Sequence, residues 1–229
     1  MSPVDEQKVV ALVPMRHHSQ RVEGKNFRPI AGRPLYAYIL ETLLQCKSVS
    51  KVVVDTDSPV ITEGIRQSFP QVELIARPMH LTADDVPMND ILLYDVEQVQ
   101  AEFYLQTHCT NPLLRVDTIS QAVHAFFQGW PSQDSLFSVT PFQTRLWTVE
   151  GEPVNHDPDE LIPTQDLEPL LIENSCLYIF SREGLMVRRH RIGQNPILFK
   201  IDPEEAIDID TEWEFELAEY RLMARQVET

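Results

Sequence analysis

Cysteine is scarce in this sequence of 229 residues, and the three cysteines that occur lie far apart. Cys46, Cys109 and Cys176 do not form the closely spaced pairs that are typical of metal sites. Each of them lies in or beside an apolar segment. We therefore expect three reduced thiols in the core.

Long apolar runs are also missing. No run approaches the roughly 18 residues that a membrane-spanning helix needs, and the first residues, MSPVDEQK, lack the layout of a signal peptide. These absences predict a cytoplasmic protein with no membrane partner.

Basic residues are few, with 19 Lys and Arg against 35 Asp and Glu, and the formal net charge is −16. Binding to nucleic acid needs a basic face that neutralises phosphates, so the composition argues against a nucleic-acid partner. Glycine is scarce as well, with seven residues against 17 prolines, which predicts many stiff loops.

The remaining composition is typical of a globular protein, with 43% hydrophobic and 24% charged residues. The length is sufficient for one α/β domain with a full core. The sequence shows no internal repeat, low-complexity tract or interdomain linker. We therefore predict a single domain over residues 1–229.

The most informative stretch is 9–35, which predicts a strand, a polar loop and a helix in succession. An apolar run at 9–13 indicates a buried strand, and Pro14 cannot continue a central ladder. Apolar residues at helical spacing follow from Pro34 onward. A loop that leaves the carboxyl end of a parallel strand is where open α/β sheets bind ligands.

The loop between these elements reverses the charge of the chain. Residues 16–33 contain five Arg or Lys and one acid, Glu23, in a protein of net charge −16. A cationic loop with a serine hydroxyl and free turn amides suits a polyphosphate. The alternative is a solvated surface loop without a ligand.

The spacing of this loop resembles that of the cytidylyltransferases that activate acidic sugars, the acylneuraminate and 3-deoxy-manno-octulosonate enzymes. Their first strand leads into P-A-R-x-x-S, then K-N or K-P, then G-[KR]-P-[LM]. The corresponding segments here are 14–19 (PMRHHS), 24–26 (GKN) and 32–35 (GRPL). The sequence departs at His17, His18 and Gln20, and Arg21 is placed to replace the Lys expected at position 20.

The resemblance implies a single Rossmann-like nucleotidyltransferase domain with a mainly parallel central sheet. It also implies transfer of CMP from CTP to the anomeric hydroxyl of a 2-keto-3-deoxy sugar acid, with release of pyrophosphate. Three cations would hold the triphosphate in catalysis: Arg16, Arg21 and Lys25. The nucleotide would further contact Ser19, Asn26, Arg77 and Met88, with Asn26 and Arg77 beside the cytosine.

Two further blocks follow the family order. Residues 55–59 (DTDSP) resemble S-T-D-S, and we interpret them as a helix cap rather than a catalytic group. The loop 106–115 resembles L-Q-P-T-S-P-L-R only loosely. One alignment places Gln106 against the sugar and the other places His108 there, and the sequence leaves both open.

Residues 141–173 predict an irregular excursion with a hairpin near 150–151. In the resembling enzymes this segment crosses to a second subunit, which implies a homodimer anchored here by Leu146 and Trp147. Gln165 and Arg145 would contact the sugar, and Arg115 is another candidate cation. Thr164 stands where the sialate enzymes have an Arg, which argues against N-acetylneuraminate.

Two C-terminal features complete the prediction. Arg188–Arg191 read as a basic helix end on a solvated face. In 206–218, alternation on a strand end would place Asp208 and Asp210 on one face, where carboxylates can share a hard cation. The resemblance implies Mg²⁺ at this pair, whereas Asp210 could instead cap the following helix.

The expected function is thus a cytidylyltransferase that uses CTP, Mg²⁺ and a small sialic-acid-like sugar acid. Two alternatives remain. One is a nucleotidyltransferase for another sugar class, such as an octulosonate or a sugar phosphate, and the other is a non-catalytic nucleotide-binding relative.

Overall fold

The computed structural model describes residues 7–228. A seven-stranded sheet forms its centre, in the order β5-β4-β1-β6-β8-β7-β9. In chain order the strands are β1 (Val9–Leu12), β4 (Val49–Thr56), β5 (Glu73–Ala76), β6 (Phe103–Thr107), β7 (Ser135–Phe142), β8 (Leu170–Ser181) and β9 (Pro196–Lys200).

The sheet is mainly parallel, as the sequence predicted. Strand β1 pairs in parallel with both β4 and β6, and β8 runs antiparallel between β6 and β7. From β1 the chain moves outward to β4 and β5, then returns to β6 on the other side of β1. This reversal creates a switch point at the carboxyl ends of β1 and β6, where such sheets bind ligands.

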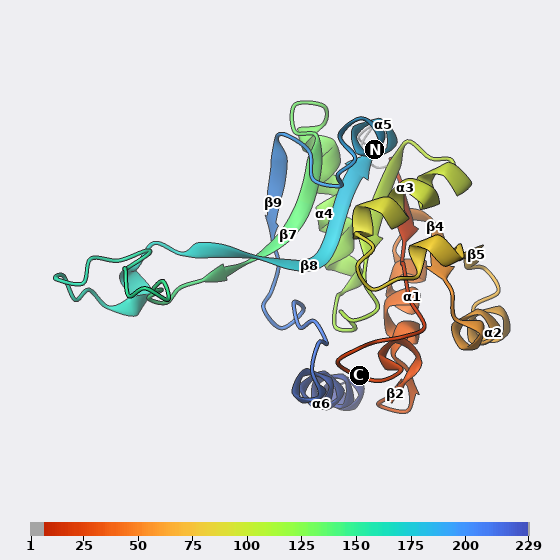
Figure 1. Cartoon of the computed structure of the whole chain (residues 1–229), viewed down its shortest axis with the longest axis horizontal. Coiled ribbons are helices and arrows are strands. Elements are labelled where there is room, and N and C mark those ends of the chain that lie inside the picture. Colours follow the sequence, from red (N-terminus) through yellow and green to blue (C-terminus); the bar gives the residue numbers. More distant parts are fainter. Residues whose placement is uncertain (1–6, 229) are drawn as a thin grey trace.

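Helices cover both faces of the sheet (Figure 1). Helices α1 (Leu35–Gln45), α2 (Pro59–Ser68) and α4 (Val116–Gly129) pack on one face, and α3 (Met88–Gln98) and α5 (Arg182–Arg188) on the other. The first strand is an unbroken apolar run because Val9 and Ala11 face one layer while Val10 and Leu12 face the other. No helix in the described part of the chain has the length and apolar character to cross a bilayer.

Helix α6 (Glu212–Glu228) lies apart from these layers and fastens the C-terminal segment to the loop after β1. A separate apolar cluster joins Phe215 and Ile209 to Val22, Ile30 and Leu35. The small β2 (Pro29–Ile30) and β3 (Arg33–Pro34) pair beside it. The helix therefore brings two sequence-distant segments together at the carboxyl edge of the sheet.

The start of α6 bears on two predictions, the strand at 206–210 and the capping role of Asp210. Residues 206–210 do not form the predicted strand, because Ile209 N makes a single bond to Thr110 O at 3.0 Å instead of a ladder. Thr211 and Glu214 cap the helix reciprocally, with Glu214 N donating to Thr211 Oγ1 at 3.3 Å and Thr211 N to Glu214 Oε2 at 2.8 Å. Asp210 is therefore not the cap, and its carboxylate instead pairs with Arg21 and Lys25.

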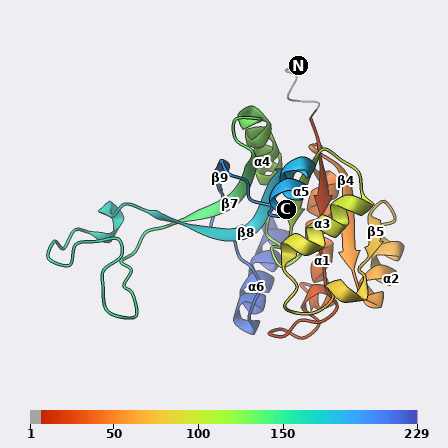
Figure 2. The ribbon, with the colours of Figure 1, turned by 45° about the horizontal axis from the view of Figure 1, so that its top comes forward.

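The 141–173 segment forms a long arm. Strands β7 and β8 continue as a two-stranded ribbon, with pairs from Val139↔Glu173 to Phe142↔Leu170, and both views show it extending from the body (Figures 1 and 2). A bridge between Trp147 and Pro153 closes the predicted hairpin near residue 150.

Candidate nucleotide site

A cavity of about 420 Å³ lies at the carboxyl edge of the sheet, at the switch point. Loops after β1, β5 and β6, the start of α3 and the segment before α6 line it. Ten of the thirteen residues predicted for the site line it together: Arg16, Ser19, Arg21, Lys25, Asn26, Arg77, Met88, His108, Asp208 and Asp210. Gln106 does not line it.

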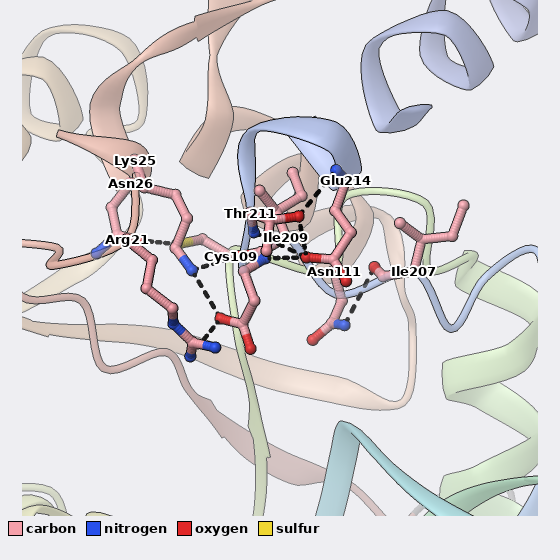
Figure 3. Close-up of polar contacts among 10 residues, drawn as sticks. Arg21, Lys25, Asn26, Cys109, Asn111, Ile207, Ile209, Thr211 and Glu214 are labelled. Carbon is pink, nitrogen blue, oxygen red and sulfur yellow. Dashed lines mark hydrogen bonds and ion pairs between the residues drawn. The ribbon is translucent and has the colours of Figure 1, made fainter. Parts of the chain in front are cut away.

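One wall of the cavity pairs two cations with one carboxylate (Figure 3). Arg21 Nη2 lies 2.9 Å from Asp210 Oδ1, and Lys25 Nζ lies 3.2 Å from the same oxygen. Lys25 also donates to the carbonyl of Ile209, and only 9% of it is exposed. The cationic loop after β1 and the acidic segment before α6 are thus in direct contact.

Backbone geometry directs Lys25 and Asn26 inward. They lie in a single 3₁₀ turn (Lys25–Phe27) that follows Gly24, which has φ of 61°. This left-handed conformation favours glycine, and a Cβ there would meet the Phe27 ring at 3.0 Å. Asn26 Nδ2 then donates to Arg16 O at 2.8 Å, and Cys109 Sγ donates to Asn26 Oδ1 at 3.1 Å.

The three cysteines are free and buried, as predicted. Burial raises the pKa of Cys109 to about 12, so its thiol remains protonated and can donate to Asn26. This bond links the loop after β1 to the loop after β6. Cys109 is therefore part of the cavity wall as a hydrogen-bond donor.

Asp208 has the properties expected of a cation ligand. Its Oδ1 is buried and has no hydrogen-bond partner, and burial, with Asp210 nearby, raises its pKa. An unsatisfied carboxylate oxygen is unfavourable without a ligand. Proteins usually bind Mg²⁺ through one or two carboxylates, and waters and substrate phosphates supply the remaining ligands. The pair of Asp208 and Asp210 suits this arrangement. The residues present therefore fit the metal.

The mouth of the cavity contains a carboxylate whose role the sequence did not reveal. Asp84 Oδ1 lies 2.5 Å from Arg16 Nη1, and Gln20 donates to its other oxygen. Gln20, which stands where the family has Lys, therefore serves to hold Asp84 beside Arg16.

Arg77 belongs to a buried charged group. Its Nε donates to Asp55 Oδ1 at 3.0 Å, and both side chains are almost fully buried. Asp95 on α3 is 1% exposed and lies against Asp55. Burial, together with the Asp55 charge, raises the pKa of Asp95 to about 9, so this carboxyl is protonated at neutral pH.

The sequence analysis missed Asp55 and Asp95 as a pair. The available signal was an acid within the apolar stripe of the 88–98 helix. The capping interpretation of the neighbouring segment is confirmed, since Ser58 Oγ accepts from Ile61 N at 3.3 Å. His17 packs beside it, with Nδ1 2.7 Å from Ser58 Oγ, and does not line the cavity.

The sequence left open whether Gln106 or His108 faces the sugar, and in the structure only His108 lines the cavity. Gln106 is fully buried, and its Nε2 lies 2.9 Å from His108 Nε2. His108 lines the cavity, and burial, followed by the charges of Arg191 and Lys25, lowers its pKa to about 3. Arg191 is half-buried and bonded to Gln106, so the predicted solvated face is wrong at this position.

The predicted sugar contacts of the arm do not reach the cavity of their own chain. Arg145 donates to the carbonyl of Ile162 and lies 3.4 Å from Thr164 Oγ1. Gln165 accepts from Gln143 through its backbone carbonyl at 2.7 Å. Arg115, the other candidate cation, lies beside Glu205.

A cavity at the switch point of a parallel sheet, lined by cations and by a carboxylate pair, is typical of a nucleotidyltransferase. The chain belongs to the cytidylyltransferase family, whose model matches residues 10–225. It is thus an enzyme of the nucleotidyltransferase class.

Similar proteins agree with this assignment. The chain is 29% identical to the CMP-N,N'-diacetyllegionaminic acid synthase of Legionella pneumophila, covering 93% of this chain and 95% of that one. It is 24% identical to the N-acylneuraminate cytidylyltransferase of Escherichia coli, covering 92% of this chain and 51% of that one. The fold matches a CMP:2-keto-3-deoxy-manno-octonic acid synthetase complexed with CTP (TM-score 0.72, 18% identity, covering 96% of this chain and 100% of that one).

Proposed function

We propose that this enzyme transfers CMP from CTP to the anomeric hydroxyl of a 2-keto-3-deoxy sugar acid of the sialic-acid-like nonulosonate type. The hydroxyl oxygen forms a bond to the α-phosphorus, the bond from that phosphorus to the β-phosphate oxygen breaks, and pyrophosphate leaves. The hydroxyl proton passes to solvent or to a basic group of the cavity. Such chemistry depends mainly on positioning and charge neutralisation.

The loop after β1 supplies the groups for the triphosphate. Arg21 and Lys25 approach the cavity from the same side, and Arg16 lies at its mouth. Ser19 and the turn amides complete the anion site. In the unliganded chain, carboxylates neutralise these cations, which keeps Lys25 paired despite its burial.

Asp208 and Asp210 would hold Mg²⁺, which would neutralise negative charge on the triphosphate. The observation that carries the proposal is the buried, unpartnered Oδ1 of Asp208, a residue that lines the same cavity as Arg21 and Lys25. A bound cation would satisfy that oxygen.

Base recognition would fall to Arg77 and Asn26, with Met88 on the apolar side. The cluster of Asp55 and Asp95 fixes Arg77 from behind, so its guanidinium has one orientation.

The acceptor class follows from the relatives, which are named for N-acylneuraminate, diacetyllegionaminic acid, pseudaminic acid and 3-deoxy-manno-octulosonate. All of these are sugar acids. The match to N,N'-diacetyllegionaminic acid synthase spans nearly the whole of both chains, which favours a nonulosonate.

We further propose a homodimer in which the arm packs on a second copy. The arm exposes Trp147, Val149 and Leu161, each at least half accessible, and Arg145 and Gln165 lie on it. Exposed apolar side chains on a projecting ribbon favour burial against another chain. Arg145 and Gln165 would then reach the partner's cavity.

A substrate panel tests the proposal. Wild-type enzyme with CTP and Mg²⁺ is mixed with N-acetylneuraminate, N,N'-diacetyllegionaminate, pseudaminate, 3-deoxy-manno-octulosonate or 2C-methyl-erythritol 4-phosphate, and pyrophosphate release is measured. We expect release with at least one nine-carbon acid. Release with the sugar phosphate alone would refute the proposed acceptor class.

A further inference from the structure

Arg191 is the one arginine that reaches from the α5–β9 connection into the wall behind His108. Its backbone N donates to Asn89 Oδ1 of α3 at 3.1 Å, and its Nη1 donates to Gln106 Oε1 of β6 at 2.5 Å. Its guanidinium lies 3.5 Å from the centre of the Tyr178 ring of β8. Three elements therefore fix one cation beside the cavity.

The hydrogen bonds define the orientation of Gln106. An arginine can only donate, so the oxygen of the Gln106 amide must face Arg191. The amide nitrogen then lies 3.1 Å from Thr107 O and 2.9 Å from His108 Nε2. Both are acceptor positions, so every polar atom of this buried amide is satisfied in one orientation only.

This orientation also selects the tautomer of His108. Because Gln106 donates to Nε2, that nitrogen must be the acceptor, and the ring proton lies on Nδ1. His108 lines the cavity, so it offers one N–H donor to a ligand. The low pKa of His108 agrees with an imidazole that stays neutral.

Arg191 also contacts Tyr178, which lies beside another cavity-lining residue, Ser175. Tyr178, on which it stacks, donates to Glu173 and lies 3.2 Å from Ser175 Oγ. Ser175 lines the cavity and has a backbone φ of 58°, which residues other than glycine rarely adopt. Packing of Arg191 on Tyr178 therefore also supports Ser175, a second cavity-lining residue besides His108.

The positive charge of Arg191 is attracted by Glu173, the carboxylate that accepts from the Tyr178 hydroxyl. Its sequence neighbour Arg189 pairs with Asp90 at 3.5 Å, whereas no described Asp or Glu forms an ion pair with Arg191. Burial lowers the pKa of Arg191, which shows that its charge is partly desolvated. A half-buried cation whose carboxylate neighbour acts only indirectly adds positive charge behind the His108 wall of the cavity.

We propose that Arg191 is a positioning and specificity-determining residue for the acceptor. It fixes Gln106, and through it the His108 N–H donor, and its positive charge behind His108 favours an anionic acceptor such as a carboxylate-bearing sugar. This inference rests on the proposed function for the identity of the acceptor, but the hydrogen-bond relay exists without it.

The test compares Arg191→Gln and Arg191→Lys with the control Arg188→Gln, an exposed arginine in the last turn of α5. The probe is whichever sugar acid of the panel supports pyrophosphate release by wild type. Because a hydrogen bond from a charged donor is lost, we expect Arg191→Gln to raise the acceptor KM at least about tenfold. The KM for CTP should stay within about twofold, Lys should restore part of the acceptor affinity, and the control should match wild type.

A second measurement needs no acceptor. ¹⁵N NMR of histidine-labelled wild type should show His108 with Nδ1 protonated and Nε2 unprotonated, and Arg191→Gln should lose this preference. A wild-type His108 protonated on Nε2 would overturn the relay. An unchanged acceptor KM in Arg191→Gln, or equal rises for CTP and acceptor, would overturn the specificity role. Failure of wild type with every acid would instead refute the proposed function.

Discussion

The two carboxylates before α6 should respond oppositely in stability and alike in activity when each is changed to asparagine. Asp208 has a buried oxygen without a partner and a raised pKa, so its charge is unfavourable in the folded state. Asp208→Asn should therefore leave the free energy of unfolding unchanged or increase it.

Asp210→Asn should destabilise the fold. The substitution removes the ion pairs to Arg21 at 2.9 Å and Lys25 at 3.2 Å. Lys25 is nearly buried and would retain only the Ile209 carbonyl among the contacts described here. The Asp210 side chain is 37% exposed, so water compensates in part. We expect a loss of about 1–2 kcal/mol, the lower part of the range for hydrogen bonds to charged groups.

Both variants should lose more than about 10²-fold in turnover, which corresponds to about 2.7 kcal/mol of transition-state stabilisation. Urea unfolding and pyrophosphate release at saturating CTP and Mg²⁺ measure the two effects. Asp117→Asn, exposed at the start of α4 and not among the residues that line the cavity, is the matched control. Near-normal turnover of Asp208→Asn would refute its role as a metal ligand.

Three further predictions concern the cationic loop, the buried acid Asp95 and the arm. Arg21→Ala should weaken CTP binding about tenfold in calorimetry, and unchanged affinity would show that Arg21 is only solvated. Asp95 binds its proton up to about pH 9 in the folded state but only to about pH 4 when unfolded, so stability should fall as pH rises across that range. Asp95→Asn should flatten this slope in urea unfolding at pH 6 and pH 9, and an unaltered slope would contradict the raised pKa of Asp95. Light scattering at micromolar concentration should give a dimer, whereas a mass near 26.4 kDa would contradict it.

Local patterns predicted most of the sheet and the cation loop. The apolar run at 9–13 and the Pro14 that ends it were sufficient to locate β1, because a strand covered on both faces needs apolar residues throughout. Lys25 and Asn26 were found from charge and spacing, and their inward direction depends on the positive φ of Gly24.

Long-range contacts account for what the sequence could not reveal. The alternation at 206–210 indicated a strand, but Ile209 bonds to the loop after β6 and no ladder forms. Arg191 followed a run of basic residues and suggested a solvated helix end. Its burial depends on Tyr178 and Gln106, which come from distant strands. Asp95 was hidden for the same reason, since its partner Asp55 lies 40 positions earlier.

The central claim is that CMP passes to a sugar acid, and one competition reaction tests it most directly. Wild-type enzyme, CTP and Mg²⁺ are incubated with an equimolar mixture of the nine-carbon acids, 3-deoxy-manno-octulosonate and 2C-methyl-erythritol 4-phosphate, and the products are identified by mass spectrometry. The account predicts a product with the mass of a CMP-linked nine-carbon acid as the dominant species. A diphosphocytidyl product, with no CMP-linked acid, would contradict it.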